Sequence, residues 1–253
     1  MTQIDLSIII PAYQEAGTIE HNLTILGDYL KSHHLGEVEV LVMTQSDDDT
    51  AAAAQHEAKD FQHFRVISLG QRTGKGAAVR AGMFEATGRY KLFMDADLAT
   101  PLHHLDNVYD LMQRNGQVGI AVRSISRTHR GLRKLISEGG NLLTQLLIIP
   151  GIKDTQCGFK VFESGVASAI FSRQTIVGWA FDMEILLIAR KLGYRIDTFP
   201  ADDWHDPKAS GLVGDSAFKA ALGSLRDIVI IRWKSLQGEY RHPSFVYHAV
   251  KKD

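Results

Sequence analysis

The sequence predicts an α/β fold in which a doubly wound, mostly parallel sheet forms one domain. Short apolar runs typical of buried strands alternate with longer segments whose apolar residues recur at helical spacing. Polar or glycine-rich loops follow three of the apolar runs, at the sheet edge where α/β proteins bind their ligands. The 253 residues suffice for one domain with a substantial core.

Strands are predicted where a short apolar run is bounded by polar or turn-forming residues. Pro11 is expected to end the first of them, because proline cannot donate to a neighbouring strand. The predicted strands are residues 6–10, 38–43, 64–69, 90–94, 118–122, 156–162 and 195–200.

Helices are predicted from apolar spacing and from capping residues. Thr18 is expected to cap the first helix, Asp49 or Thr50 the second, and Thr100 with Pro101 the fourth. The adjacent pair His103 and His104 is expected to point apart. The predicted helices are residues 19–30, a segment after residue 50, and residues 76–86, 100–114, 131–149, 181–192 and 215–237.

The last of these helices has an apolar side formed by Phe218, Leu222, Leu225, Val229 and Trp233. Such a stripe is more often buried in a core than turned to a membrane, although both remain possible. We expect residues 1–214 to form the main domain. Residues 215–253 are then a C-terminal amphipathic helix and tail, packed on or beside it.

Composition narrows the classes of function. A net charge of −1 offers no electrostatic case for binding nucleic acid. The single cysteine excludes an intramolecular disulfide and suits a reducing compartment. We find neither a signal peptide nor an apolar run near the roughly 20 residues that a spanning helix needs. We therefore expect a cytoplasmic protein whose contact with a membrane, if any, is peripheral.

Asp95 and Asp97 follow the predicted strand 90–94 directly. At positions i and i+2 their side chains can project to the same side, and two carboxylates suit Mg²⁺ or Mn²⁺ bridging a diphosphate. Two aspartates in a solvated turn are a common alternative. The apolar strand before them and the polar loops at other strand ends favour the metal site.

Two further loops are candidates for contact with a nucleotide. In the loop 11–15, Tyr13 can pack on a base, although an ordinary strand-to-helix connection would look the same. The loop 70–76 leads into a helix, so its backbone N–H groups, the helix dipole and Lys75 form a candidate anion site. A phosphate-binding Walker A loop is excluded, because Leu69 and Gly76 stand where that motif requires glycine and Ser or Thr.

Together these segments resemble glycosyltransferase family two, whose members share the GT-A fold. The similarity is carried by residues 8–15, 74–82, 94–100, 152–160 and 179–187. The last two, containing Asp-Thr-Gln-Cys-Gly-Phe-Lys and Phe-Asp-Met-Glu, resemble a narrower branch. That branch includes dolichyl-phosphate β-glucosyltransferases and bacterial polyprenyl-phosphate glycosyltransferases, which implies a lipid-phosphate acceptor.

The resemblance also implies roles for individual residues. Asp95 and Asp97 would hold the metal, and Asp97, Asp154 and Gln156 would act at the sugar and acceptor. The implied donor-binding residues are Pro11, Ala12, Tyr13, Glu15, Ser46, Asp48, Lys75 and Asp95. The implied acceptor-phosphate residues, by similarity to dolichyl-phosphate mannose synthases, are Arg123, Arg133, Ser137 and Lys208.

The implied reaction is a metal-dependent transfer of a hexose with inversion, from a UDP-linked sugar, with glucose the first choice, to a polyprenyl or dolichyl phosphate at a membrane surface. A phosphate monoester is largely ionised at pH 7, so no strong base is needed. Met43 and Thr44 replace the acidic pair that the family usually carries there, which leaves the donor nucleotide open. The alternatives are a GDP-mannose donor, a soluble sugar or protein acceptor, and a non-catalytic nucleotide-binding protein.

Overall fold

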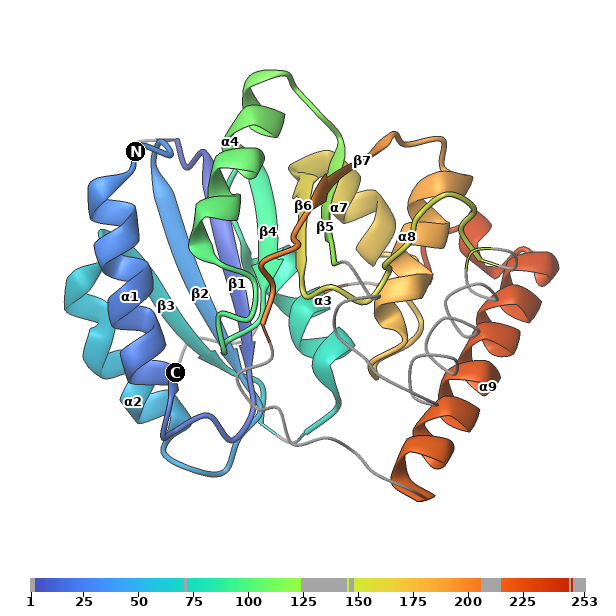
Figure 1. Ribbon diagram of the computed structural model, residues 1–253, viewed down its shortest axis with the longest axis horizontal. Helices are drawn as coiled ribbons and strands as arrows, with labels where there is room; N and C mark the ends of the chain where they lie inside the picture. The colour runs from blue at the N-terminus through green and yellow to red at the C-terminus, as the bar shows by residue number, and fades with distance from the viewer. Residues whose placement is uncertain are drawn as a thin grey trace.

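A computed structural model describes residues 3–70, 72–123, 145, 148–205, 215–245 and 247, with the backbone alone for residues 215–222 and 224. Its centre is a seven-stranded sheet in the order β3-β2-β1-β4-β6-β5-β7 (Figure 1). β6 runs antiparallel to β4 and β5, and every other pair is parallel, so the mostly parallel α/β prediction is confirmed. The strands are β1 (Leu6–Ala12), β2 (Val38–Thr44), β3 (His63–Ser68), β4 (Tyr90–Met94), β5 (Val118–Val122), β6 (Phe159–Glu163) and β7 (Ile196–Pro200).

Helices cover both faces of the sheet (Figure 1). The α-helices are α1 (Ile19–Ser32), α2 (Thr50–His56), α3 (Lys75–Glu85), α4 (Leu105–Gln113), α7 (Ser164–Phe171), α8 (Phe181–Lys191) and α9 (Asp215–Gln237). The 3₁₀ helices are η1 (Glu57–Asp60), η2 (Leu102–His104) and η3 (Glu239–Arg241). α1, α2 and α4 pack on one face, and α3, α7 and α8 on the other, where α9 lies beside α8.

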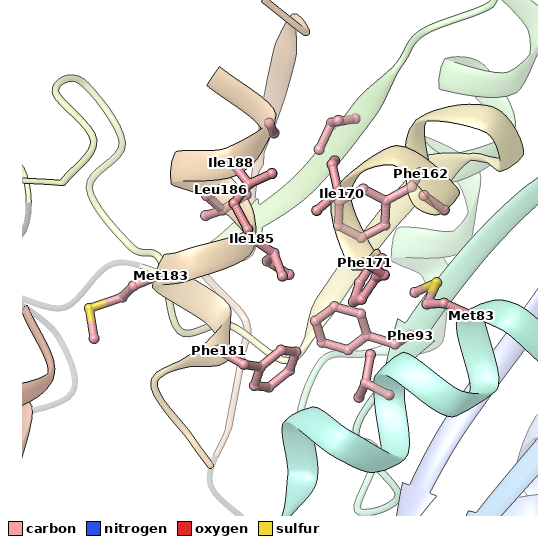
Figure 2. Packing of buried hydrophobic residues seen from close by; sticks show 14 of the residues in the cluster. Met83, Phe93, Phe162, Ile170, Phe171, Phe181, Met183, Ile185, Leu186 and Ile188 are labelled. Carbon is pink, nitrogen blue, oxygen red and sulfur yellow. The ribbon is translucent and has the colours of Figure 1, made fainter. Parts of the chain in front are cut away.

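The core alternates between the two faces along each strand. In β1, Ile8 and Ile10 join one hydrophobic cluster and Ile9 joins the other, because successive side chains of a strand point to opposite sides. Phe93 belongs to the hydrophobic cluster under α3, α7 and α8. The centroid of its ring lies 5.6 Å from that of Phe181 in α8 (Figure 2). This aromatic packing holds α8 against the strand that leads to Asp95.

β1 extends through Pro11 to Ala12, beyond the predicted end at residue 10. β2 pairs with β1 along its whole length, but β4 pairs only as far as Ile9. Beyond Ile9 the strand has a single neighbour, so a residue without a backbone N–H is tolerated there. Pro11 and Ala12 thus belong to the strand rather than to the loop after it.

The predicted N-cap positions of the first two helices are confirmed, since Thr18 precedes α1 and Asp49 precedes α2. Neither residue, however, makes a side-chain capping bond in the described structure. Thr18 instead donates to the Glu15 carboxylate (2.6 Å). The helix expected from Thr100 starts as η2 at Leu102 and becomes α4 at Leu105.

α7 is a helix that the sequence analysis does not predict. Its N-cap is Glu163, whose carboxylate accepts from the backbone N–H of Val166 (2.9 Å). Glutamate is not among the preferred N-cap residues, and Gly165 weakens the helical signal. The expected helix 131–149 lies mostly outside the described residues.

α9 is the longest described helix, with 23 residues. Ile228 and Ile231 on one side of it belong to the core cluster under α8. Across the part of the chain that the structure describes, no helix combines the length and the apolarity needed to cross a membrane. The division of the chain at residue 214 remains a prediction.

Candidate active site

The Asp95–Asp97 turn is held in place from both sides. The backbone N–H of Asp95 donates to the carbonyl of Gly158 (3.1 Å), just before β6. From α1, the side-chain amide of Asn22 donates to the carbonyl of Ala96 (2.8 Å). Leu98, directly after Asp97, has a positive φ of 53°, a conformation that is uncommon for a branched side chain. The turn is therefore a defined structure rather than a loose loop of solvated aspartates.

Lys75 and Asp95 form an ion pair at the centre of this site. Lys75 Nζ lies 2.5 Å from Asp95 Oδ1, and the two side chains are 11% and 34% exposed. Burial acts to lower the pKa of Lys75, but the carboxylates of Asp95 and Asp182 outweigh it and hold that pKa above its ordinary value. The ammonium therefore stays charged. The loop 70–76 and the turn of Asp95 therefore meet in the structure.

Glycines bring the backbone of these segments together. A Cβ at Gly158 would overlap the Asp95 carboxylate, and one at Gly74, where φ is 117°, would overlap the carbonyl of Val177. The space beside Asp95 is thus kept open by a residue without a side chain. Asp97 Oδ1 accepts from the N–H of Ala99 (3.1 Å), which orients its carboxylate. Two oriented carboxylates of this kind fit a hard divalent cation.

Gln45, which follows β2, was not singled out from the sequence. Its side-chain carbonyl accepts from the N–H groups of Thr73 (3.2 Å) and Gly74 (3.0 Å), and its amide donates to the Thr73 hydroxyl (2.6 Å). The expected anion site needs correction here, because Gln45 takes up two of the backbone N–H groups of the loop. Positive charge at this loop comes from the side chains of Arg72 and Lys75.

Tyr13 and Glu15 lie in a loop that is shaped by the segment after β2. Ser46 Oγ accepts from the N–H of Gln14 (2.6 Å), which has a positive φ of 54°, and Thr50 Oγ1 accepts from the N–H of Glu15 (2.9 Å). Tyr13 stacks under Arg72, whose Cζ lies 4.0 Å from the ring centroid. The two loops expected to contact a nucleotide are therefore neighbours.

Asp48 is tied to Thr50, the residue that starts α2. Its carboxylate accepts from the backbone N–H (3.1 Å) and the hydroxyl (2.5 Å) of Thr50. These hydrogen bonds, with the Thr50 hydroxyl first, lower the pKa of Asp48. The described contacts of Ser46 and Asp48 therefore shape the site, and their expected contact with a donor stays a prediction.

Met43 and Thr44 are fully buried at the end of β2. Met43 packs under α3, where a Cβ at Gly82 would lie 3.1 Å from its Cγ. Thr44 Oγ1 has no hydrogen-bond partner among the described residues. Where the family usually carries two acidic residues, this chain thus has core packing and one buried hydroxyl. Met43 is therefore a core residue and exposes no surface to solvent.

A second charged centre lies at the end of β5. Asp154 accepts from Arg123 through Nε (2.5 Å), Nη2 (3.1 Å) and the backbone N–H (3.2 Å), and from the N–H of Gln156 (3.0 Å). Burial acts to raise the pKa of Asp154, but the bonds and charge of Arg123 reverse this and hold it below its ordinary value. The guanidinium also stacks on Trp204, 4.7 Å from the ring centroid. Asp154 therefore positions Arg123.

For the transfer reaction that the resemblance implies, Asp154→Asn should lower kcat/KM about 10- to 100-fold, the usual cost of losing a partner that orients a site residue. The main change should be a higher KM for the acceptor, because a neutral amide no longer fixes the Arg123 guanidinium. Steady-state kinetics with the acceptor varied would test this, with Asp110→Asn, an exposed aspartate of α4, as the control. Because the pKa of Asp154 is already low, its ionisation should add no limb to the wild-type rate profile above pH 5. A pure loss of kcat with unchanged KM would contradict the positioning role.

Asp182 and Lys160 form a buried ion pair beneath the site, a contact that the sequence analysis did not foresee. Both side chains are at most 2% exposed, and Lys160 Nζ also donates to the carbonyl of Cys157 (2.5 Å). Burial raises the pKa of Asp182, against the lowering effect of Lys160 and Lys75. The pair joins α8 to β6, and the negative charge of Asp182 contributes to the raised pKa of Lys75.

Glu184, the second acidic residue of the Phe-Asp-Met-Glu segment, has a structural role. Its buried carboxylate accepts from the N–H groups of Thr175 (3.1 Å) and Ile176 (2.9 Å) and from the Tyr240 hydroxyl (3.0 Å). It therefore fastens the loop before α8. That loop contacts the start of α3, where the N–H of Ala77 donates to the carbonyl of Val177 (3.2 Å).

His103 and His104 do not point apart. In η2 both imidazoles reach Asp203, through Nε2 atoms 3.1 Å and 2.8 Å from its carboxylate oxygens. This joins the segment after Asp97 to the segment after β7. The expected acceptor-phosphate residues Arg133, Ser137 and Lys208 lie outside the described residues, so of that group the structure places Arg123 alone.

Comparison with known proteins shows the family to which the chain belongs. The family model for "Glycosyl transferase family 2" matches residues 7–171, more than half of the chain. Dolichyl-phosphate beta-glucosyltransferase of Dictyostelium discoideum is 31% identical, over 94% of this chain and 77% of that protein. The Homo sapiens protein of the same name is 32% identical, over 93% and 77%.

Solved structures share the fold. Mannosyl-3-phosphoglycerate synthase from Rubrobacter xylanophilus has a TM-score of 0.68 at 15% identity, over 96% of this chain and 77% of that one. Glucosyl-3-phosphoglycerate synthase from Mycobacterium tuberculosis, in complex with Mn²⁺, uridine diphosphate and phosphoglyceric acid, has a TM-score of 0.61 at 20% identity, over 90% and 78%. The chain belongs to glycosyl transferase family 2.

Proposed function

We propose that this enzyme transfers a glucosyl group, with inversion, from UDP-glucose to a polyprenyl or dolichyl phosphate. The similarity to dolichyl-phosphate beta-glucosyltransferases over more than nine-tenths of the chain supports the sugar and the acceptor. The observation that carries the proposal is the pairing of Asp154 with Arg123. In this pairing the Asp154 carboxylate holds the Arg123 guanidinium in position instead of acting as a base. A positioned guanidinium suits an acceptor that is itself an anion, such as a phosphate.

The reaction needs no strong base in this scheme. A phosphate oxygen of the acceptor forms the new bond to the anomeric carbon while the bond to the diphosphate oxygen breaks, and the nucleoside diphosphate leaves with the electron pair. The acceptor phosphate is already ionised near pH 7, since its second pKa is about 6. Arg123 orients it through charge-assisted hydrogen bonds, and the rigid contact with Asp154 limits its movement.

Asp95 and Asp97 would hold Mg²⁺ or Mn²⁺, which would supply charge stabilisation for the departing diphosphate. Lys75 provides a second positive charge beside Asp95, where negative charge develops as the donor bond breaks. Tyr13, Glu15, Ser46 and Asp48 would surround the nucleotide, on the loops that the structure brings together. We propose that Gln156, exposed next to Asp154, faces the sugar and acceptor.

We further propose that the enzyme works as a peripheral protein at the cytoplasmic face of a membrane, because its acceptor is a lipid. A direct assay would test the function as a whole: purified protein with radiolabelled UDP-glucose, Mn²⁺ and a short-chain polyprenyl phosphate. We expect a lipid-extractable glucosyl phosphate in the β configuration. Product from GDP-mannose alone would overturn the donor assignment, and transfer only to water-soluble sugars or proteins would overturn the acceptor assignment.

A further inference from the structure

α9 carries a row of large apolar side chains that face solvent. Val229, Trp233 and Leu236 are 64%, 63% and 67% exposed, and Leu225 is 39% exposed. Single exposed apolar residues are ordinary, but four on one helix form a contiguous patch that calls for a partner. The core-facing residues of the same helix are Ile228, Ile231 and Ser235. The expectation that the predicted stripe packs in the core is therefore wrong for Leu225, Val229 and Trp233, and Leu236 extends the exposed face.

Basic residues border the patch on both sides. With 100° between successive residues, Leu225, Leu236, Val229 and Trp233 fall within an arc of about 80°. Arg232 lies about 20° beyond one edge and Arg226 about 20° beyond the other, and both are exposed. Asp227, the only acidic residue among the described side chains of α9, lies about 160° from the centre of the arc.

We propose that this face of α9, formed by Leu225, Arg226, Val229, Arg232, Trp233 and Leu236, docks in the headgroup region of an anionic lipid bilayer. A helix with an apolar stripe between arginines and with tryptophan at its surface fits an interface where the apolar residues enter the acyl boundary and the arginines meet lipid phosphates. The proposal rests on the proposed function in one respect: a lipid-phosphate acceptor has to reach the site from a bilayer.

The docked helix is firmly joined to the catalytic body. Lys191 of α8 donates to the carbonyl of Ser235 (2.6 Å), and Lys234 donates to the Thr175 hydroxyl (2.8 Å). Thr175 belongs to the loop that Glu184 fastens and that contacts the start of α3 next to Lys75. Through these contacts, docking of α9 would fix the position of the active site relative to the lipid surface.

Vesicle binding in the absence of donor and acceptor tests the surface by itself. The probes are phosphatidylcholine vesicles with and without 30% phosphatidylserine, and the readouts are co-sedimentation and tryptophan fluorescence. We expect wild-type protein to bind the anionic vesicles with a blue shift. The triple variant Val229→Ser, Trp233→Ser, Leu236→Ser should bind at least tenfold more weakly, and Arg226→Gln with Arg232→Gln should lose the preference for phosphatidylserine. The matched control is Arg114→Gln with Arg195→Gln, two exposed arginines away from α9.

Transfer assays separate this inference from the proposed function. The triple variant should retain wild-type turnover with a short-chain, water-soluble polyprenyl phosphate and lose at least tenfold with a long-chain acceptor in anionic vesicles. A wild-type protein that transfers no glucose but binds vesicles through this face would defeat the function and leave the docking surface standing. Vesicle binding that the triple variant preserves would overturn the surface. So would a wild-type dimer, seen by analytical ultracentrifugation, that the triple variant dissociates, because a second copy would then cover the face.

Discussion

Asp97→Asn should lower kcat/KM for glucosyl transfer by about 10³-fold, which corresponds to about 4 kcal/mol of lost transition-state stabilisation. Asparagine can keep the hydrogen bond from the N–H of Ala99, so the turn should persist. What is lost is the negative charge with which Asp97 would hold a divalent cation. Initial rates as a function of Mn²⁺ concentration would measure the effect.

The control for this variant is Asp110→Asn, which changes charge equally on the exposed side of α4 and should keep full activity. Thermal melting without ligand should be nearly unchanged for both variants. With UDP and Mn²⁺ present, wild-type protein should melt at a higher temperature and Asp97→Asn should not, since a ligand stabilises the state that it binds. Equal Mn²⁺-dependent stabilisation in both would defeat the metal assignment.

Lys160→Met should lower the free energy of unfolding by about 3–5 kcal/mol, because it leaves Asp182 buried without its cation. The matched control is Lys91→Met. Lys91 is also buried, but its described hydrogen bond goes to the carbonyl of Met83 (2.8 Å), so about 1 kcal/mol is expected. Urea unfolding followed by circular dichroism would compare the two variants.

The loss in Lys160→Met should depend on pH. Burial already raises the pKa of Asp182 above its ordinary value, and removal of Lys160 removes a lowering effect. A carboxyl whose folded-state pKa is raised binds a proton on folding, so the variant's stability should fall as pH rises above about 4. The deficit should therefore be larger at pH 8 than at pH 5. The double variant Lys160→Met, Asp182→Leu should recover most of the stability, and no recovery would argue against the pair as the cause.

The sheet and the aspartate turn could be predicted because they depend on patterns local in the sequence. The apolar run 90–94 predicts a buried strand, and its two following aspartates then lie at a sheet edge. The convergence of Lys75 with Asp95 follows from the same rule, since both come after parallel strands. Strand order and the antiparallel direction of β6 could not be deduced, because neither leaves a periodic signal.

The side-chain partners were harder to foresee. Gln45 forms hydrogen bonds with Thr73 and Gly74, which lie 28 and 29 positions further along the chain. Asp182 meets Lys160 only because α8 packs under β6. Thr18 has the residue type of a helix cap but finds a closer partner in Glu15. For α9, the sequence shows a stripe but not which side the body of the protein covers. Such choices are made by tertiary packing.

The ion pair of Lys75 and Asp95 has a consequence for what the site will accept. In the described structure each charge neutralises the other, so a lone metal ion must compete with an ammonium group, and free inorganic phosphate with a carboxylate. A diphosphate that arrives with its own cation can replace both partners in a single exchange. If Asp95 and Lys75 bind the metal and the diphosphate as proposed, the pair would discriminate against either ion alone, and binding of metal and of nucleotide should strengthen each other.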